Sequence, residues 1–362
     1  MKVSKVKCAA LALAVLALPA FAQGPEMRPL VPSGAKAAVL YRQNKSPVLK
    51  PVRDAMQKAF GAGYAAAMAD DDAQTAATAD AMLKASGIFD AEVLWGTMWV
   101  KGEFASAASG SLSSSDEIAG AVYFKSDFTR TLDSLLGMAN LDDATTVTPV
   151  DVAGVRASRI QSADFASSGL DPHVAVMNGR LLLFASGKPA LERAIALYSG
   201  NAQAGRFFHG GAGGSSSVLS FEIADIGEIF RQIEKEMPGS LGFLDQAVPG
   251  GSGIACRAKH VALYLTASQS VSLSLSVELG SKADADAVKA VLDAMLVGMR
   301  QQFDSIPPDA MDGEMKMARD MLRSVKVSVD GSTLEAGMIV PPAVIDLFVS
   351  GMLEAIPAVT SK

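Results

Sequence analysis

Three histidines and Cys256 are the residues of this chain best suited to metal binding or nucleophilic catalysis. His173, His209 and His260 are far apart in sequence, and none has a second histidine within four residues. Zinc sites need such closely spaced ligands, so the sequence predicts no metal ligand and no cofactor. Each histidine falls where a strand or a loop is expected to end, and we interpret all three as surface residues.

Cys256 and His260 are four residues apart, which could place a thiol nucleophile beside a base. If residues 255–265 form a strand, however, the two side chains lie on one face about 13 Å apart. That separation is too long for a hydrogen bond. We therefore expect Cys256 to be a small buried core residue.

Motifs for serine catalysis, phosphate binding and calcium binding are incomplete. Ser33-x-x-Lys36 matches a pattern of penicillin-binding enzymes, but the companion Ser-Asp-Asn and Lys-Thr-Gly motifs are missing. The glycine run 210–214 lacks the Gly-Lys-Ser/Thr ending of a phosphate loop. The three aspartates at 70–72 lack the spaced ligands of a calcium loop, and we interpret them as residues that end one helix and cap the next.

Two looser groups of side chains leave alternatives open. Met311, Met315, Met317 and Met321 carry thioethers, which are ligands for copper(I), but an amphipathic helix accounts for most of their spacing. Carboxylates far apart in sequence could also assemble into a site in the folded chain. The candidates are Glu92, Glu103, Asp164 and Asp171. Apart from that option, the sequence predicts no catalytic residue.

The first 22 residues have the layout of a cleaved secretory signal. Three lysines precede an unbroken apolar run over residues 8–18, and Ala20-Phe21-Ala22 ends the segment. The apolar run is shorter than the roughly 20 residues that cross a membrane. We therefore predict cleavage after Ala22 and a periplasmic or otherwise exported location. Cys8 leaves with this segment, so Cys256 has no partner for an intramolecular disulfide.

The charge of the remaining chain argues against polyanionic partners. Without residues 1–22, 340 residues remain with 29 basic and 38 acidic side chains, a net charge of −9. Nucleic-acid binding requires a basic surface, so we expect no nucleic-acid partner. After residue 22 no apolar stretch reaches spanning length, and we expect no transmembrane segment in the mature chain.

Alternating strands and amphipathic helices predict an α+β fold. Apolar residues alternate at period 2 over 261–279. Asn178-Gly179 and Asp330-Gly331 are typical of tight hairpin turns, and a strong amphipathic pattern begins at Ser281.

The glycine- and serine-rich stretch 210–217 is the predicted linker between two lobes, residues 23–209 and residues 218–362. Each lobe is expected to be an antiparallel sheet with amphipathic helices packed on one face. A strand, an aspartate and a helix recur at Asp127 and Asp225, 98 residues apart. We interpret this as an internal duplication of roughly 95–100 residues. The alternative is a common arrangement that occurs twice by chance.

This arrangement resembles a loosely defined family of uncharacterised exported bacterial proteins built from tandem α+β lobes. The likeness rests on three segments, Pro32–Tyr41, Asn178–Leu191 and Cys256–Leu279. The resemblance implies a location in the cell envelope and supplies no activity.

The leading functional hypothesis is therefore an exported, non-catalytic protein of the cell envelope with a binding or scaffold role. Its partner would be a protein or an apolar ligand of the envelope. The alternative is a carrier or sensor of lipid-like apolar ligands. A hydrolase of envelope polymers is the third option, and it requires two carboxylates that face each other across a cleft.

Overall fold

The computed structural model describes residues 29–43, 46–51, 91–102, 116–139, 144–208, 217–347 and 350. The strands in these ranges are β1 (Ala37–Arg42), β2 (Val93–Lys101), β3 (Glu117–Phe124), β4 (Thr145–Val152), β5 (Val155–Ser162), β6 (His173–Met177), β7 (Leu181–Ala185), β8 (Ser217–Ala224), β9 (His260–Ala267), β10 (Val271–Glu278), β11 (Lys326–Asp330) and β12 (Thr333–Val340). The helices are η1 (Pro47–Leu49), α4 (Thr129–Ala139), α5 (Ala163–Ser167), α6 (Lys188–Tyr198), α7 (Ile226–Glu236), α8 (Gly242–Ala247), α9 (Gly251–Arg257), α10 (Lys282–Asp304), η4 (Pro308–Ala310) and α11 (Gly313–Ser324).

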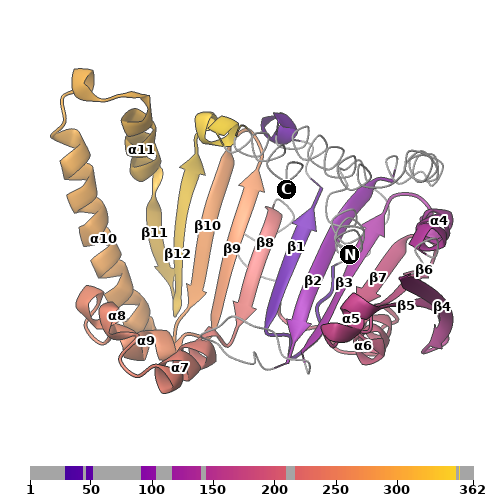
Figure 1. Ribbon diagram of the computed structural model, residues 1–362. Coiled ribbons are helices and arrows are strands. Elements are labelled where there is room, and N and C mark those ends of the chain that lie inside the picture. The colour runs from indigo at the N-terminus through magenta and orange to yellow at the C-terminus, as the bar shows by residue number, and fades with distance from the viewer. Residues whose placement is uncertain are drawn as a thin grey trace.

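All twelve strands belong to one sheet, in the order β11-β12-β10-β9-β8-β1-β2-β3-β7-β6-β5-β4. The strand pairs are antiparallel. Helices and antiparallel strands together confirm the predicted α+β class. Figure 1 shows the sheet extending across the whole molecule, with β1 and β8 side by side near its middle.

A separate sheet in each lobe was predicted, and the structure shows one continuous sheet instead. β1 pairs with β8, so that Leu40 lies opposite Ser220. An unpaired strand edge leaves backbone N–H and C=O groups without partners, and the β1–β8 pairing removes one such edge from each half. Ser217, the last residue of the predicted linker 210–217, is the first residue of β8, and the rest of the linker lies outside the described residues.

The strands before and after that linker nevertheless follow the same order. We call β1–β7 the N-terminal half and β8–β12 the C-terminal half. Outward from the centre of the sheet, the N-terminal half begins β1-β2-β3-β7-β6, and the C-terminal half runs β8-β9-β10-β12-β11. The hairpins β6–β7 and β11–β12 therefore occupy corresponding places.

In the N-terminal half, helices cover both faces of the sheet. Leu191 and Ile195 of α6 join a buried cluster with Trp99 and Leu183 on one face. Phe128, just before α4, stacks on the Phe124 ring with centroids 3.8 Å apart and belongs to a second cluster. The prediction of amphipathic helices packed against the sheet is confirmed here.

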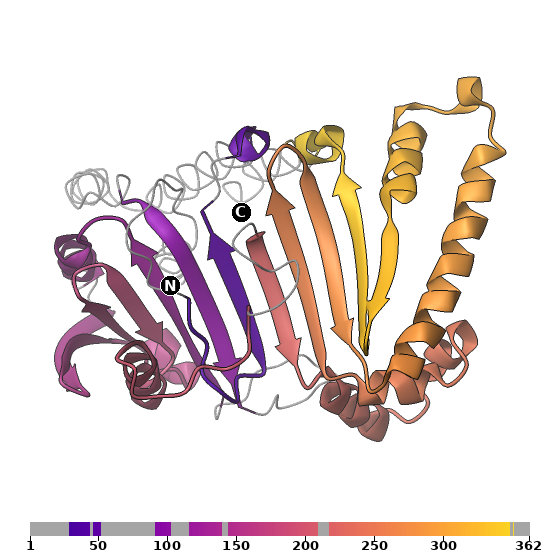
Figure 2. The ribbon, with the colours of Figure 1, turned by 180° about the vertical axis from the view of Figure 1, so that it is seen from behind.

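In the C-terminal half, the helices lie at the ends and the edge of the sheet. α9 packs against α7 and α8 at one end, and α10 lies along β11. No described helix crosses β8, β9 or β10 in either view (Figure 1, Figure 2). Helix packing against these strands is found toward their ends, where Ile345 packs with Val271 and Leu265 and where Val288 of α10 packs with Val277.

Several local predictions are confirmed because neighbouring residues decide them. Asn178 and Gly179, with φ of 51° and 70°, form the turn between β6 and β7, since the mirror-image hairpin turns need positive φ. The Ser281 side chain accepts a hydrogen bond from the Asp284 amide and caps α10. Pro189 lies in the first turn of α6, where its missing N–H costs nothing.

Candidate functional site

Of the three histidines, two lie in the described residues, and His173 is not the surface residue that was predicted. His173 on β6 is buried at 2% exposure, and its Nδ1 lies 2.6 Å from the carbonyl oxygen of Asp171. A carbonyl can only accept, so Nδ1 carries the hydrogen in this contact. His260 is the first residue of β9, and its Nε2 lies 3.2 Å from Oε2 of Glu222. His209 lies outside the described residues.

Cys256 and His260 do not form a catalytic pair. Cys256 lies on helix α9 and not on the predicted strand, and it is half-buried. Its backbone carbonyl accepts a hydrogen bond from Arg231. His260 points to Glu222, so its ring is engaged with a carboxylate.

The candidate carboxylates are not brought together where the structure describes them. Glu92 pairs with Lys125 at 2.8 Å, and Asp171 pairs with Arg159 at 2.5 Å. The amide of Lys125, just past one end of β3, donates to the carbonyl oxygen of Glu92. The amide of Asp171 donates to Ser186, whose own amide donates to Ile118 near the other end of β3, so the two acids are attached near opposite ends of this strand. Asp164 lies within α5. Glu103, like the aspartates at 70–72, lies outside the described residues.

The Ser33-x-x-Lys36 match contains no nucleophile–base contact. The Lys36 ammonium lies 2.9 Å from Glu228 and 3.0 Å from Asp225. Its hydrogen bond to Glu228, assisted by Asp225, holds the pKa of Lys36 above its ordinary value. Lys36 therefore stays charged and connects β1 to the start of α7, where Asp225 itself makes no capping hydrogen bond through its side chain.

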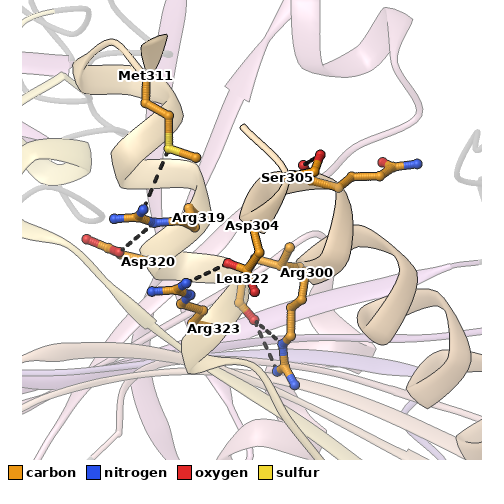
Figure 3. A network of polar contacts seen from close by, with 9 residues as sticks. Arg300, Asp304, Ser305, Met311, Arg319, Asp320, Leu322 and Arg323 are labelled. Atoms are coloured by element: carbon orange, nitrogen blue, oxygen red, sulfur yellow. Dashed lines mark hydrogen bonds and ion pairs between the residues drawn. The ribbon is translucent and has the colours of Figure 1, made fainter. Parts of the chain in front are cut away.

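The methionine-rich segment is stabilised by arginines (Figure 3). Arg319 reaches the sulfur of Met311 at 3.6 Å, and a guanidinium there disfavours a second cation. Arg300 of α10 donates to the backbone carbonyls of Leu322 and Val325, at the end of α11. These contacts join α10 and α11 into a helical hairpin.

Within the described ranges, no three His, Cys, Asp or Glu side chains are grouped so that they could hold a metal ion. No helix in those ranges combines the length and the apolarity that crossing a membrane requires.

The feature that stands out is an apolar face on the C-terminal half. Cross-strand register places apolar side chains opposite one another on the same face of β8, β9, β10 and β12. One row runs through Phe221, Leu263, Leu275 and Ala336, and the next through Leu219, Leu265, Leu273 and Met338. A third row contains Ile223, Val261, Val277 and Leu334, of which Val277 and Leu334 pack in the cluster with α10 and so form the covered edge of this face. We call these twelve residues the apolar face.

Burial on β8 is reversed from the usual pattern, in which apolar side chains are inside. Leu219 and Phe221 are 43% and 39% exposed, whereas Ser220 and Glu222 are 0% and 1% exposed. On β9, Leu263 is likewise exposed and its neighbour Tyr264 is buried. Contiguous exposed apolar side chains on a folded chain are a mark of binding surfaces.

The apolar face offers a ligand few hydrogen bonds. β8, β9 and β10 each have a paired strand on both sides, so their backbone N–H and C=O groups are engaged within the sheet. The side chains in the central rows are hydrocarbon, apart from the thioether of Met338. A ligand on this face must therefore be held by apolar contact.

Helix α10 also carries exposed apolar side chains. Met295, Val297 and Met299 are each more than a third exposed. The predicted apolar stripe of this helix is buried only near its start, where Ala285, Val288 and Leu292 pack in a cluster with Leu334. The sequence predicted the alternating pattern over 261–279, which covers β9 and β10, but did not indicate that its apolar side is exposed.

Comparisons with known proteins give no named relative. No family model and no curated protein matches the chain. Two solved structures, crystal forms IV and I of TP0453, have TM-scores of 0.41 and 0.38 with 14% and 12% sequence identity. The alignments cover 91% of this chain in both cases, and 97% and 99% of the respective structures. Likeness at this level supports no inference about function.

Proposed function

We propose that this protein is an exported, non-catalytic binding protein of the cell envelope, which holds the hydrocarbon part of a lipid-like ligand on the apolar face. The observation that carries the proposal is the reversed burial on β8, where leucine and phenylalanine face solvent and serine and glutamate are inside. Covering solvent-exposed leucines of this kind with a ligand stabilises the complex by roughly 25 cal/mol per Å² of apolar surface buried.

The chemistry of the surface favours hydrocarbon over a protein partner. Protein interfaces commonly carry about ten direct hydrogen bonds, and the strands under the apolar face have their backbone groups already paired within the sheet. Methionine adapts its shape to different apolar ligands, and Met338, Met295 and Met299 lie on this face or on α10. A scaffold that binds another protein is the second candidate.

We further propose that the two halves arose by duplication, with β1-β2-β3-β7-β6 equivalent to β8-β9-β10-β12-β11. The shared strand order supports this. The repeat is then longer than the predicted 95–100 residues, because β3 corresponds to β10 and not to β8. In this account the N-terminal half kept a covered sheet, and the C-terminal half became the binding surface.

The proposal is tested by ligand binding to variants of the apolar face. Native mass spectrometry and titration with a long-chain fatty acid measure binding to the purified protein. The double variant Leu263→Ser/Leu275→Ser should lower the affinity about tenfold or more, because full burial of one leucine is worth about 1.5–3 kcal/mol and each has only part of its surface left to bury.

Leu170→Ser is the matched control, since Leu170 is as exposed as Leu275 but lies in the N-terminal half, outside the apolar face. It should bind the fatty acid like the wild-type protein. Absence of fatty-acid binding, or equal binding by the double variant and the wild-type protein, would contradict the proposal.

A further inference from the structure

A buried carboxylate lies on the side of β8 opposite the apolar face. Glu222 is 1% exposed and lies between Ala38 on β1 and Ala262 on β9. Its Oε1 accepts a hydrogen bond from the Tyr264 hydroxyl at 3.1 Å. Its Oε2 lies 3.2 Å from Nε2 of His260, whose side chain is 29% exposed. His260 therefore connects the buried acid to solvent.

Glu222 also binds the main chain just before the glycine-rich stretch. The backbone N–H of Phe208 donates to both carboxylate oxygens, at 3.2 and 3.1 Å. Phe208 has a φ of 63°, in the left-handed region, which is strained for a bulky residue. Such a conformation persists only when surrounding contacts enforce it, and the bond to Glu222 is one of those contacts.

The charge of His260 matters because a buried carboxylate needs a counter-charge. Burial and then the Glu222 carboxylate raise the pKa of Tyr264, so its hydroxyl stays neutral. It donates a hydrogen bond to Glu222 but cannot supply the positive counter-charge. Among the described neighbours, Lys36 is committed to Asp225 and Glu228. Glu278 lies opposite His260 on β10 and pairs with Lys259. Arg206 is exposed to solvent, and Glu335 adds a further negative charge near Tyr264.

We infer that Glu222 and His260 form a pH-dependent latch, which holds the chain at Phe208 against β8 while the imidazole is protonated and loosens it when the imidazole is neutral. Histidine is the side chain whose charge changes over the physiological pH range. The latch is therefore closed at mildly acidic pH and weaker at alkaline pH. Loosening lets Phe208 leave its strained conformation and frees Phe207, whose ring contacts His260 edge-on with centroids 6.1 Å apart. This inference does not depend on the proposed function.

The latch is tested by amide hydrogen exchange of the full-length protein, followed by mass spectrometry of peptides that contain Phe208. Exchange is expressed as a protection factor, which removes the intrinsic dependence of exchange on pH. We expect protection at Phe208 to fall about tenfold between about pH 5.5 and about pH 8. A peptide from β7 should keep its protection and reports on global folding.

His260→Gln should remove the fall. His173→Gln is the matched control, since His173 is bonded to a carbonyl and not to Glu222, and His209→Gln tests the histidine next to Phe208 in sequence. Both should retain the fall. Tyr264→Phe should lower protection at both pH values, and the fall in protection between them should remain. If His260→Gln loses protection in β7, Glu222→Gln takes its place and should likewise remove the fall.

Constant protection of Phe208 in the wild-type protein would overturn the latch. So would a fall that persists in His260→Gln, or one that disappears in His209→Gln.

Discussion

In the N-terminal half, Leu181, Leu182 and Leu183 follow one another on β7, and each is at most 2% exposed. In the C-terminal half, Leu263 and Leu275 lie opposite each other on β9 and β10, and each is more than a third exposed. The two halves share one strand order, with β7 in the place of β12 and with β2 and β3 in the places of β9 and β10. Topology therefore does not decide which part of a sheet becomes core. In the N-terminal half α6, and Phe128 with α4, cover β3 and β7, whereas the described helices pack on β8 to β10 only toward the ends of these strands.

The largest difference between the halves should appear when leucines are truncated. Leu183→Ala should lower the free energy of unfolding by about 2–5 kcal/mol, because it leaves a cavity in a closely packed core. Leu263→Ala should cost below about 1 kcal/mol, because its side chain is already partly in water. Urea denaturation of both variants checks this. Equal costs would show that Leu263 is a core residue and would remove the contrast.

Two strand glycines should give the next largest difference. A methyl group at Gly120 on β3 would lie 2.5 Å from the carbonyl oxygen of Thr97 and closer still to the Phe184 ring, whereas at Gly337 on β12 the nearest atom would be 3.4 Å away. Gly120→Ala should therefore destabilise by about 1–3 kcal/mol. Gly337→Ala should be close to neutral, because glycine is unfavourable in strands. Thermal unfolding measures both, and a loss of stability in Gly337→Ala would contradict the open packing of the C-terminal half.

Acid stability should distinguish the ion pairs of the two halves. Arg193 on α6 binds both oxygens of Glu117, at 2.7 and 2.9 Å, and these hydrogen bonds lower the pKa of Glu117 although burial opposes them. Such a carboxylate stabilises the folded state at pH values above its unfolded-state pKa. The stabilisation is lost as the pH falls through the lowered folded-state pKa.

Glu117→Gln should therefore cost about 1 kcal/mol near neutral pH, discounted for partial exposure, and progressively less in acid. Glu278→Gln is the control, because its pair with Lys259 in the C-terminal half is exposed, and it should change little. Urea titrations from neutral to acidic pH compare the two. A constant cost in Glu117→Gln would refute the assignment.

The smallest global effect is expected in the helical hairpin at the edge of the C-terminal half. No residue within α11 is buried, so the Arg300 contacts to Leu322 and Val325 carry much of its attachment. Arg300→Ala should weaken that attachment by about 1 kcal/mol and should leave the unfolding of the sheet unchanged. Hydrogen exchange over residues 313–324 detects this. Lys282→Ala, which breaks an exposed pair with Asp286 at the other end of α10, should not alter that exchange.

The sequence predicted the elements better than their environment. The Asn178-Gly179 turn and the Ser281 cap depend on residues a few positions apart, and both form as expected. The stretch 249–253 is rich in glycine, a composition typical of loops, but Gly251 begins α9. A side chain at Gly251 would collide with the backbone of Leu244 on α8, so this glycine serves helix packing, which the sequence does not reveal.

The candidate site was predicted only in part. The alternating pattern over 261–279 correctly placed apolar side chains on one face of the sheet, but it did not indicate that this face is exposed. The Glu222 cluster was missed altogether. Its members come from β8, β9 and the chain near Phe208, and no spacing along the sequence marks them as neighbours.

The sequence by itself determined the α+β class, the hairpin turns, the helix caps and the two-sided character of the strands, because each depends on side chains and backbone within a few residues. Only the tertiary structure decided that β1 and β8 join the halves into one sheet, that the serine and glutamate side of β8 is buried, and that its leucine side faces solvent. Apolar residues that alternate with polar ones indicate that the two faces of a strand differ. Which face is covered depends on segments distant in sequence, and their packing is settled by the whole fold.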